Sequence, residues 1–123
     1  MSVSMTLDAV RAQAKTVTRR HVDSWKHLKP GDRLTLIEKG MGLPKGAKQV
    51  VVCEVEIVSV TVEPLWEIHV DPYETRREGL PGMSPDEFIA FWLKGHKHKP
   101  TDDPRMVLCR RIEWRYLHES DDE

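Results

Sequence analysis

The chain has 123 residues, of which 39% are hydrophobic and 32% charged, and this length and composition indicate one globular domain with its own apolar core. It has no run of about 18 apolar residues and no basic-then-apolar start, so we expect a cytoplasmic protein without a membrane span. The net charge of −1 conceals a basic segment, residues 11–48, with ten Lys/Arg and three Asp/Glu; this favours an anionic partner such as a nucleotide or nucleic acid, unless the charges scatter over loops.

The first predicted elements are a helix over Leu7–Ala14, with Thr6 as its N-cap, and an extended segment over Thr16–Arg19. Lys15 falls between them. On a straight strand, Lys15 and Thr18 would point to opposite faces because they are three residues apart. The two side chains can act together only if the junction between helix and strand lies at Lys15.

Three strands are predicted after the basic motif, over Arg33–Glu38, Val50–Val62 and residues 107–116. In the two long strands the alternation of apolar residues changes phase. A side-chain period of two shifts only at a bulge or where a strand changes its buried face. We therefore expect an α+β fold with a small, strongly curved β-barrel and flanking helices.

Two helices are predicted between the long strands. A short one begins near Asp71 and runs to about Arg77. The second covers Ser84–Lys94, because Ser84 and Glu87 form a capping box, Pro85 occupies the first turn and an apolar face follows. The acidic residues 118–123 are expected to form a frayed tail.

The six histidines suggest a metal site, but His96 and His98 lie among lysines without a Cys or carboxylate at ligand spacing. We therefore expect no metal and no other cofactor. Cys53 and Cys109 lie far apart in apolar runs, which is typical of reduced, buried thiols.

The four tryptophans divide into two pairs. Trp92 and Trp114 lie on apolar faces and are expected in the core. Trp25 and Trp66 lie in polar surroundings. They either line a cleft, where they would stack on a base, or pack under loops.

Several short motifs occur in a characteristic order: Lys-x-x-Thr-x-Arg at residues 15–20, Lys-Pro-Gly-Asp before a strand, Arg-Glu-Gly-Leu at 77–80, a Ser-Pro-Asp-Glu-Phe helix start, and Arg-Ile-Glu-Trp-Arg-Tyr-Leu at 111–117. Together they resemble the ASCH domain family of the PUA-like superfamily, in particular its small bacterial and phage-type members. The resemblance covers about residues 3–117. It implies one ASCH-like domain over residues 1–117, and the composition of residues 118–123 predicts an acidic, disordered tail after it. The family signature begins with a glycine, a position that Gln13 occupies here.

Some members of this family are amidohydrolases that remove the acyl group from N4-acetylcytidine and related compounds. By resemblance, Lys15, Thr18 and Glu78 would form the catalytic set, and no metal would be needed. Thr18 would be the nucleophile and Lys15 its base, although Thr16 offers a second hydroxyl. Glu78 would protonate the leaving nitrogen and then activate water. The residues expected to contact the substrate are Arg19, Arg20, Trp25 and Trp66.

Other family members resemble RNA-binding modules or ribonucleases, and the basic segment fits this alternative. The expected partner is therefore a modified nucleoside, with RNA as the alternative and no membrane. We favour the amidohydrolase because the domain stands alone in this sequence.

Overall fold

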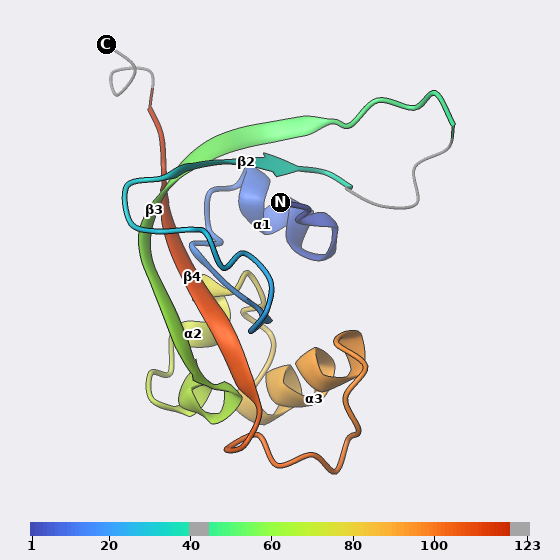
Figure 1. Cartoon of the computed structure of the whole chain (residues 1–123), viewed down its shortest axis with the longest axis vertical. Coiled ribbons are helices and arrows are strands. Elements are labelled where there is room, and N and C mark those ends of the chain that lie inside the picture. Colours follow the sequence, from blue (N-terminus) through green and yellow to red (C-terminus); the bar gives the residue numbers. More distant parts are fainter. Residues whose placement is uncertain (40–44, 119–123) are drawn as a thin grey trace.

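The computed structural model describes residues 1–39 and 45–118. Its two longest strands, β3 (Val51–Pro64) and β4 (Leu108–Tyr116), pair in antiparallel fashion. β1 (Val17–His21) pairs with β4, and β2 (Arg33–Ile37) pairs with β3, which gives the order β1-β4-β3-β2. The strands bend along their length (Figure 1). The expected α+β fold with a small, strongly curved β-barrel and flanking helices is confirmed, in the form of a four-stranded antiparallel sheet that curls into a half-barrel.

The change of phase in the long strands has the predicted cause. The register between β3 and β4 shifts between Ile57 and Ser59, where the apolar alternation of β3 changes phase. β4 instead changes its buried face. Trp114 belongs to one hydrophobic core and Cys109 to the other. β4 thus contributes side chains to both hydrophobic cores.

The helices are short. They are the 3₁₀ helices η1 (Ser4–Thr6) and η2 (Leu65–His69) and the α-helices α1 (Leu7–Arg11), α2 (Glu74–Arg77) and α3 (Pro85–Gly95). Figure 1 shows α1 close to β2, on the inner side of the bend in the sheet, and α3 near the lower end of β4. Sequence reasoning missed η2, and α1 ends three residues before the predicted Ala14.

α3 is the helix that the sequence predicts best. The Ser84 hydroxyl accepts a bond from Glu87 N at 3.1 Å, and Glu87 Oε1 accepts one from Ser84 N at 3.1 Å. Its apolar face, with Phe88 and Trp92, is buried in the second core. The capping box and the buried face are both confirmed.

Other expectations have mixed outcomes. Trp92 and Trp114 are buried as predicted. Both cysteines are free thiols, but only Cys109 is fully buried, whereas Cys53 is half-buried. Across the described ranges, no helix is both long and apolar enough to span a bilayer. Of the expected acidic tail, residues 119–123 lie outside the described residues.

Candidate active site

The junction between α1 and β1 is a tight reversal of the chain. Gln13 has a φ of 57°, in the left-handed region. The amides of Ala14 and Lys15 both donate to the Ala9 carbonyl, at 2.8 and 3.2 Å, which closes the end of α1. The chain then enters β1 two residues later. A left-handed residue favours glycine because side chains with a Cβ crowd the following carbonyl.

The Gln13 conformation leads to a prediction for stability. Replacing Gln13 with glycine should raise the free energy of unfolding by about 1 kcal/mol, because it removes the cost of a left-handed non-glycine residue. Gln13→Val should lower it, since β-branched residues tolerate this region least. Urea unfolding of the three proteins measures the differences. A Gln13→Gly variant less stable than the natural chain would contradict the assignment of strain here.

Lys15 is fixed at both its backbone and its side chain. Its carbonyl accepts hydrogen bonds from Trp114 Nε1, at 3.0 Å, and from the Tyr116 hydroxyl. Its Nζ donates to the Glu78 carbonyl and lies 3.6 Å from Glu78 Oε1. Lys15 is only 4% exposed. β4 therefore fixes the backbone of Lys15, and Glu78 holds its amine in a buried position.

Glu78 reaches Lys15 because the chain after α2 passes very close to the junction. Gly79 has a φ of 85°, and a Cβ at this position would lie 3.0 Å from the Ala9 Cβ and 3.2 Å from the Lys15 Cβ. Only glycine satisfies both the conformation and the close approach. In addition, the Arg77 carbonyl accepts a bond from Thr16 N at 2.8 Å. These contacts seat the Glu78 segment on the first helix and strand.

The Glu78 carboxylate is held by Arg19 as well as by Lys15. Oε2 accepts from Arg19 Nη1 at 3.0 Å, and Oε1 accepts from Arg19 N at 3.3 Å. The Arg19 side chain is 1% exposed and also pairs with Glu74 at 3.1 Å and with Glu63 at 3.8 Å. Arg19 thus faces three carboxylates, and its role here is to fix Glu78.

The environment of Lys15 favours the neutral amine. Burial is the largest influence and lowers its pKa from the usual value, and the charges of Arg20 and Arg19 lower it further, whereas the Glu78 carboxylate raises it. The net direction is downward. A lowered pKa is the property that a lysine needs in order to act as a general base.

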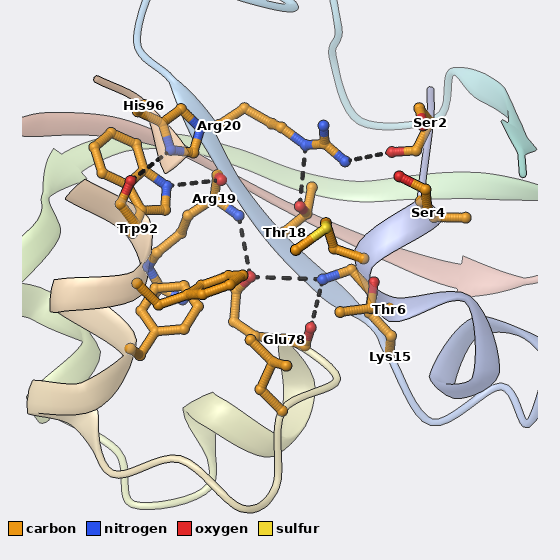
Figure 2. Close-up of a pocket in the computed structure, with 15 residues that line it drawn as sticks. Ser2, Ser4, Thr6, Lys15, Thr18, Arg19, Arg20, Glu78, Trp92 and His96 are labelled. Atoms are coloured by element: carbon orange, nitrogen blue, oxygen red, sulfur yellow. Dashed lines mark hydrogen bonds and ion pairs between the residues drawn. The ribbon is translucent and has the colours of Figure 1, made fainter. Parts of the chain in front are cut away.

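Thr18 and Arg20 complete the polar part of the site. Arg20 Nε donates to Thr18 Oγ1 at 3.2 Å, and Nη2 donates to the Ser2 carbonyl at 2.8 Å. Because a guanidinium can only donate, Thr18 Oγ1 is the acceptor in this bond and its own proton remains available to a base. Figure 2 shows Arg20 reaching across Thr18 to Ser2, with Lys15 and Glu78 meeting beside them.

These side chains border a pocket of about 190 Å³ between the N-terminal segment, β1 and α3. Lys15, Thr18, Arg19 and Glu78 are its most buried polar members, at 3–4% exposure. Apolar and aromatic side chains form most of the remaining wall. The lining residues outside the catalytic set and the two arginines are Ser2–Thr6, Leu80, Phe88, Phe91, Trp92 and His96.

The structure brings five of the seven predicted site residues to this pocket: Lys15, Thr18, Arg19, Arg20 and Glu78. Trp25 and Trp66 are not among its lining residues; they are 37% and 43% exposed.

Trp66 packs against His69 with ring centroids 4.1 Å apart and an interplanar angle of 36°, and Arg105 lies over its indole. Thr16, the alternative nucleophile, does not line the pocket either.

Sequence reasoning missed three contributions to the wall. The sequence pattern predicts Trp92 in the core alone, but it lies at the boundary between core and pocket. The sequence suggests His96 only as a candidate metal ligand, whereas it lines the pocket. No sequence signal marked Ser2–Thr6, because their place depends on the pairing of the N-terminal segment with β2. Within residues 1–39 and 45–118, no three His, Cys, Asp or Glu side chains gather as a metal site.

No family model and no curated protein matches this chain in sequence. Among solved structures, it is similar to protein EF3133 from Enterococcus faecalis, which carries the family designation DUF984. The TM-score is 0.63 at 16% identity, over 93% of this chain and 71% of the other. At this identity the likeness concerns the fold, and it supports the curved sheet with flanking helices.

Proposed function

We propose that this protein is an amidohydrolase of the ASCH type that removes the acyl group from N4-acylated cytosine nucleosides. One observation carries the proposal: a buried lysine with a lowered pKa contacts a glutamate in the same pocket as a threonine hydroxyl. A base, a proton carrier and a nucleophile are the groups that amide cleavage without a metal requires.

In the first half of the reaction, Thr18 Oγ attacks the exocyclic amide carbonyl while Lys15 accepts the hydroxyl proton. The proton then passes to Glu78, whose Oε1 lies 3.6 Å from Lys15 Nζ, and on to the departing nitrogen. The C–N bond breaks, and an acyl ester on Thr18 remains. The oxyanion is stabilised by Arg20 or by backbone N–H groups near the motif.

In the second half, Glu78 takes a proton from a water molecule that attacks the ester. The ester bond breaks, and the proton returns to Thr18 Oγ through Lys15. The products are the free cytosine amine and the carboxylic acid, and the enzyme regains its starting protonation. The assignment of Thr18 rather than Thr16 is supported by the pocket, which Thr18 lines and Thr16 does not.

The test is the conversion of N4-acetylcytidine to cytidine, followed by the change in ultraviolet absorption. Thr18→Ala should abolish turnover, whereas Thr18→Ser should keep part of it because the hydroxyl remains. Thr16→Ala is the matched control and should retain activity near that of the natural chain. Lack of turnover on any N4-acylcytidine, or full activity in Thr18→Ala, would refute the mechanism.

The RNA-binding and ribonuclease alternatives remain predictions of the sequence. The basic segment supports them less than its charge suggests, because Lys15 and Arg19 point inward to Glu78 and Arg11 pairs with Glu38. A gel shift with a small RNA, repeated at rising salt, would reveal phosphate contacts. Degradation of that RNA would indicate a ribonuclease.

A further inference from the structure

His96 lines the pocket, and one of its two ring nitrogens already has a hydrogen-bond partner. It follows the last turn of α3, and its Nδ1 lies 2.8 Å from the Trp92 carbonyl. A carbonyl oxygen only accepts, so Nδ1 must carry a hydrogen. The imidazole also stacks on the Trp92 indole, with ring centroids 3.8 Å apart and an interplanar angle of 16°. The hydrogen bond and the stacking on Trp92 together fix the orientation of the imidazole ring.

The remaining nitrogen, Nε2, is an acceptor when the ring is neutral. Burial, the largest influence, lowers the pKa of His96, and the charges of Arg20, His21 and His98 lower it further, whereas the bond to the Trp92 carbonyl raises it. The net direction favours the neutral imidazole near pH 7. The pocket therefore presents a fixed hydrogen-bond acceptor on its wall.

The position of His96 decides which part of a ligand it can meet. The reacting amide must lie at Lys15, Thr18 and Glu78, which are almost fully buried. His96 is half-buried and lies beside Trp92 on the side of the pocket that α3 supplies (Figure 2). A ligand whose amide reaches the floor of the pocket places its opposite end near this wall.

The donors on an N4-acylated cytosine nucleoside are few. The base has one N–H, on N4 at the reacting amide, and its O2 and N3 only accept. The other donors are the hydroxyls of the sugar, at the far end of the molecule. An acceptor that lies away from the catalytic groups, as His96 Nε2 does, can therefore receive a hydrogen bond only from a sugar hydroxyl.

The same pocket offers a donor for the base. Arg20 uses Nε for Thr18 and Nη2 for the Ser2 carbonyl. Among the described residues, no hydrogen-bond partner faces its Nη1. When backbone N–H groups hold the oxyanion, this nitrogen can donate to O2 or N3 of the pyrimidine, which leaves the sugar for His96.

We propose that His96 Nε2 accepts a hydrogen bond from a sugar hydroxyl, so that the enzyme selects nucleosides over bases without a sugar. The inference rests on the proposed function, since it assumes that the amide is cleaved at Thr18. It makes His96 a specificity residue that contacts the substrate and takes no part in bond breaking.

The experiment compares two substrates, N4-acetylcytidine and N4-acetyl-1-methylcytosine, which lacks both the sugar and a donor on N1. The variant His96→Phe keeps a flat ring against Trp92 but removes the acceptor. His98→Phe is the matched control, because His98 also stacks on Trp92, at 5.8 Å, but does not line the pocket. Thermal unfolding of each variant checks that the fold is retained.

We expect His96→Phe to lower kcat/KM for N4-acetylcytidine about tenfold, mainly through KM, because one neutral hydrogen bond is lost. Its kcat/KM for the methyl analogue should be unchanged, and His98→Phe should alter neither. An equal loss on both substrates, or no loss on either, would overturn the role of His96 while leaving the amidohydrolase intact. If the natural chain turns over neither substrate, the proposed function fails and this inference fails with it.

Discussion

Lys15→Met is expected to reduce kcat on N4-acetylcytidine about a thousandfold. A positioned general base typically contributes about 10²–10⁴ to the rate, and methionine keeps the apolar stem while removing the amine. The loss should appear in kcat and kcat/KM together, because proton transfer occurs only on the way to the transition state. Steady-state kinetics measured by the ultraviolet assay provide both numbers.

Two further variants separate a base from a mere positive charge. Lys15→Arg retains the charge, but a guanidinium does not release its proton and cannot act as a base. It should therefore be as inactive as Lys15→Met. Lys26→Met removes an exposed lysine that pairs with Asp23 at the surface, and it should be fully active. Substantial activity in Lys15→Arg would mean that Lys15 acts only through its charge.

The same base role sets the direction of the pH dependence. The active form of Lys15 is the neutral amine, so kcat/KM should fall as the pH drops through the pKa of this residue. Burial lowers that pKa, so the fall should lie at lower pH than for an ordinary lysine. Glu78 raises the pKa of Lys15; hence Glu78→Gln should move any residual activity toward still lower pH.

The regular elements were predictable because their signals are local. The capping box of α3 needs only Ser84 and Glu87, three residues apart, and its buried face follows the helical period. The bulge in β3 could also be predicted from a local signal. The alternation of apolar residues along the strand changes phase, and this cannot happen in a regular β-ladder. The curvature of the sheet followed from the same two strands.

The catalytic set could be proposed only through the resemblance, because Lys15 and Glu78 are 63 residues apart in sequence. Their contact depends on Gly79, where a Cβ would come within 3.2 Å of the Lys15 Cβ. Nothing within residues 13–20 encodes that approach. The left-handed conformation of Gln13 was not predicted either; the resemblance showed only that this residue replaces the glycine of the ASCH signature.

Side chains at the wall of the pocket were the hardest to predict. Trp25 and Trp66 were candidates because they are aromatic and lie among polar residues, a pattern that surface tryptophans share. His96 was judged by its lysine neighbours, which argue against a metal ligand and say nothing about a hydrogen-bond acceptor. The direction of its ring depends on Trp92, and that contact exists only at the end of a folded helix.

Arg19→Met is expected to lower the free energy of unfolding by about 3–5 kcal/mol, the range typical of breaking a buried ion pair by removing one partner. Its side chain is 1% exposed and faces Glu63, Glu74 and Glu78. Without the guanidinium, the one ion pair left to Glu78 among the described residues is that with Lys15, and Glu74 depends on Arg111 and Arg77. Urea unfolding monitored by tryptophan fluorescence provides the measurement.

Arg11→Met is the matched control from the same basic segment. Arg11 pairs with Glu38 at 3.3 Å, but its side chain is 54% exposed, and such surface pairs contribute about 0–1 kcal/mol. A loss in Arg19→Met no larger than in Arg11→Met would show that the buried network does not stabilise the fold. A loss of about 3–5 kcal/mol in Arg19→Met would support a structural role for Arg19, which holds Glu78 in place. Arg20, which keeps its Nη1 nitrogen unengaged within the described part of the chain, would then be the arginine of the motif that can contact the substrate.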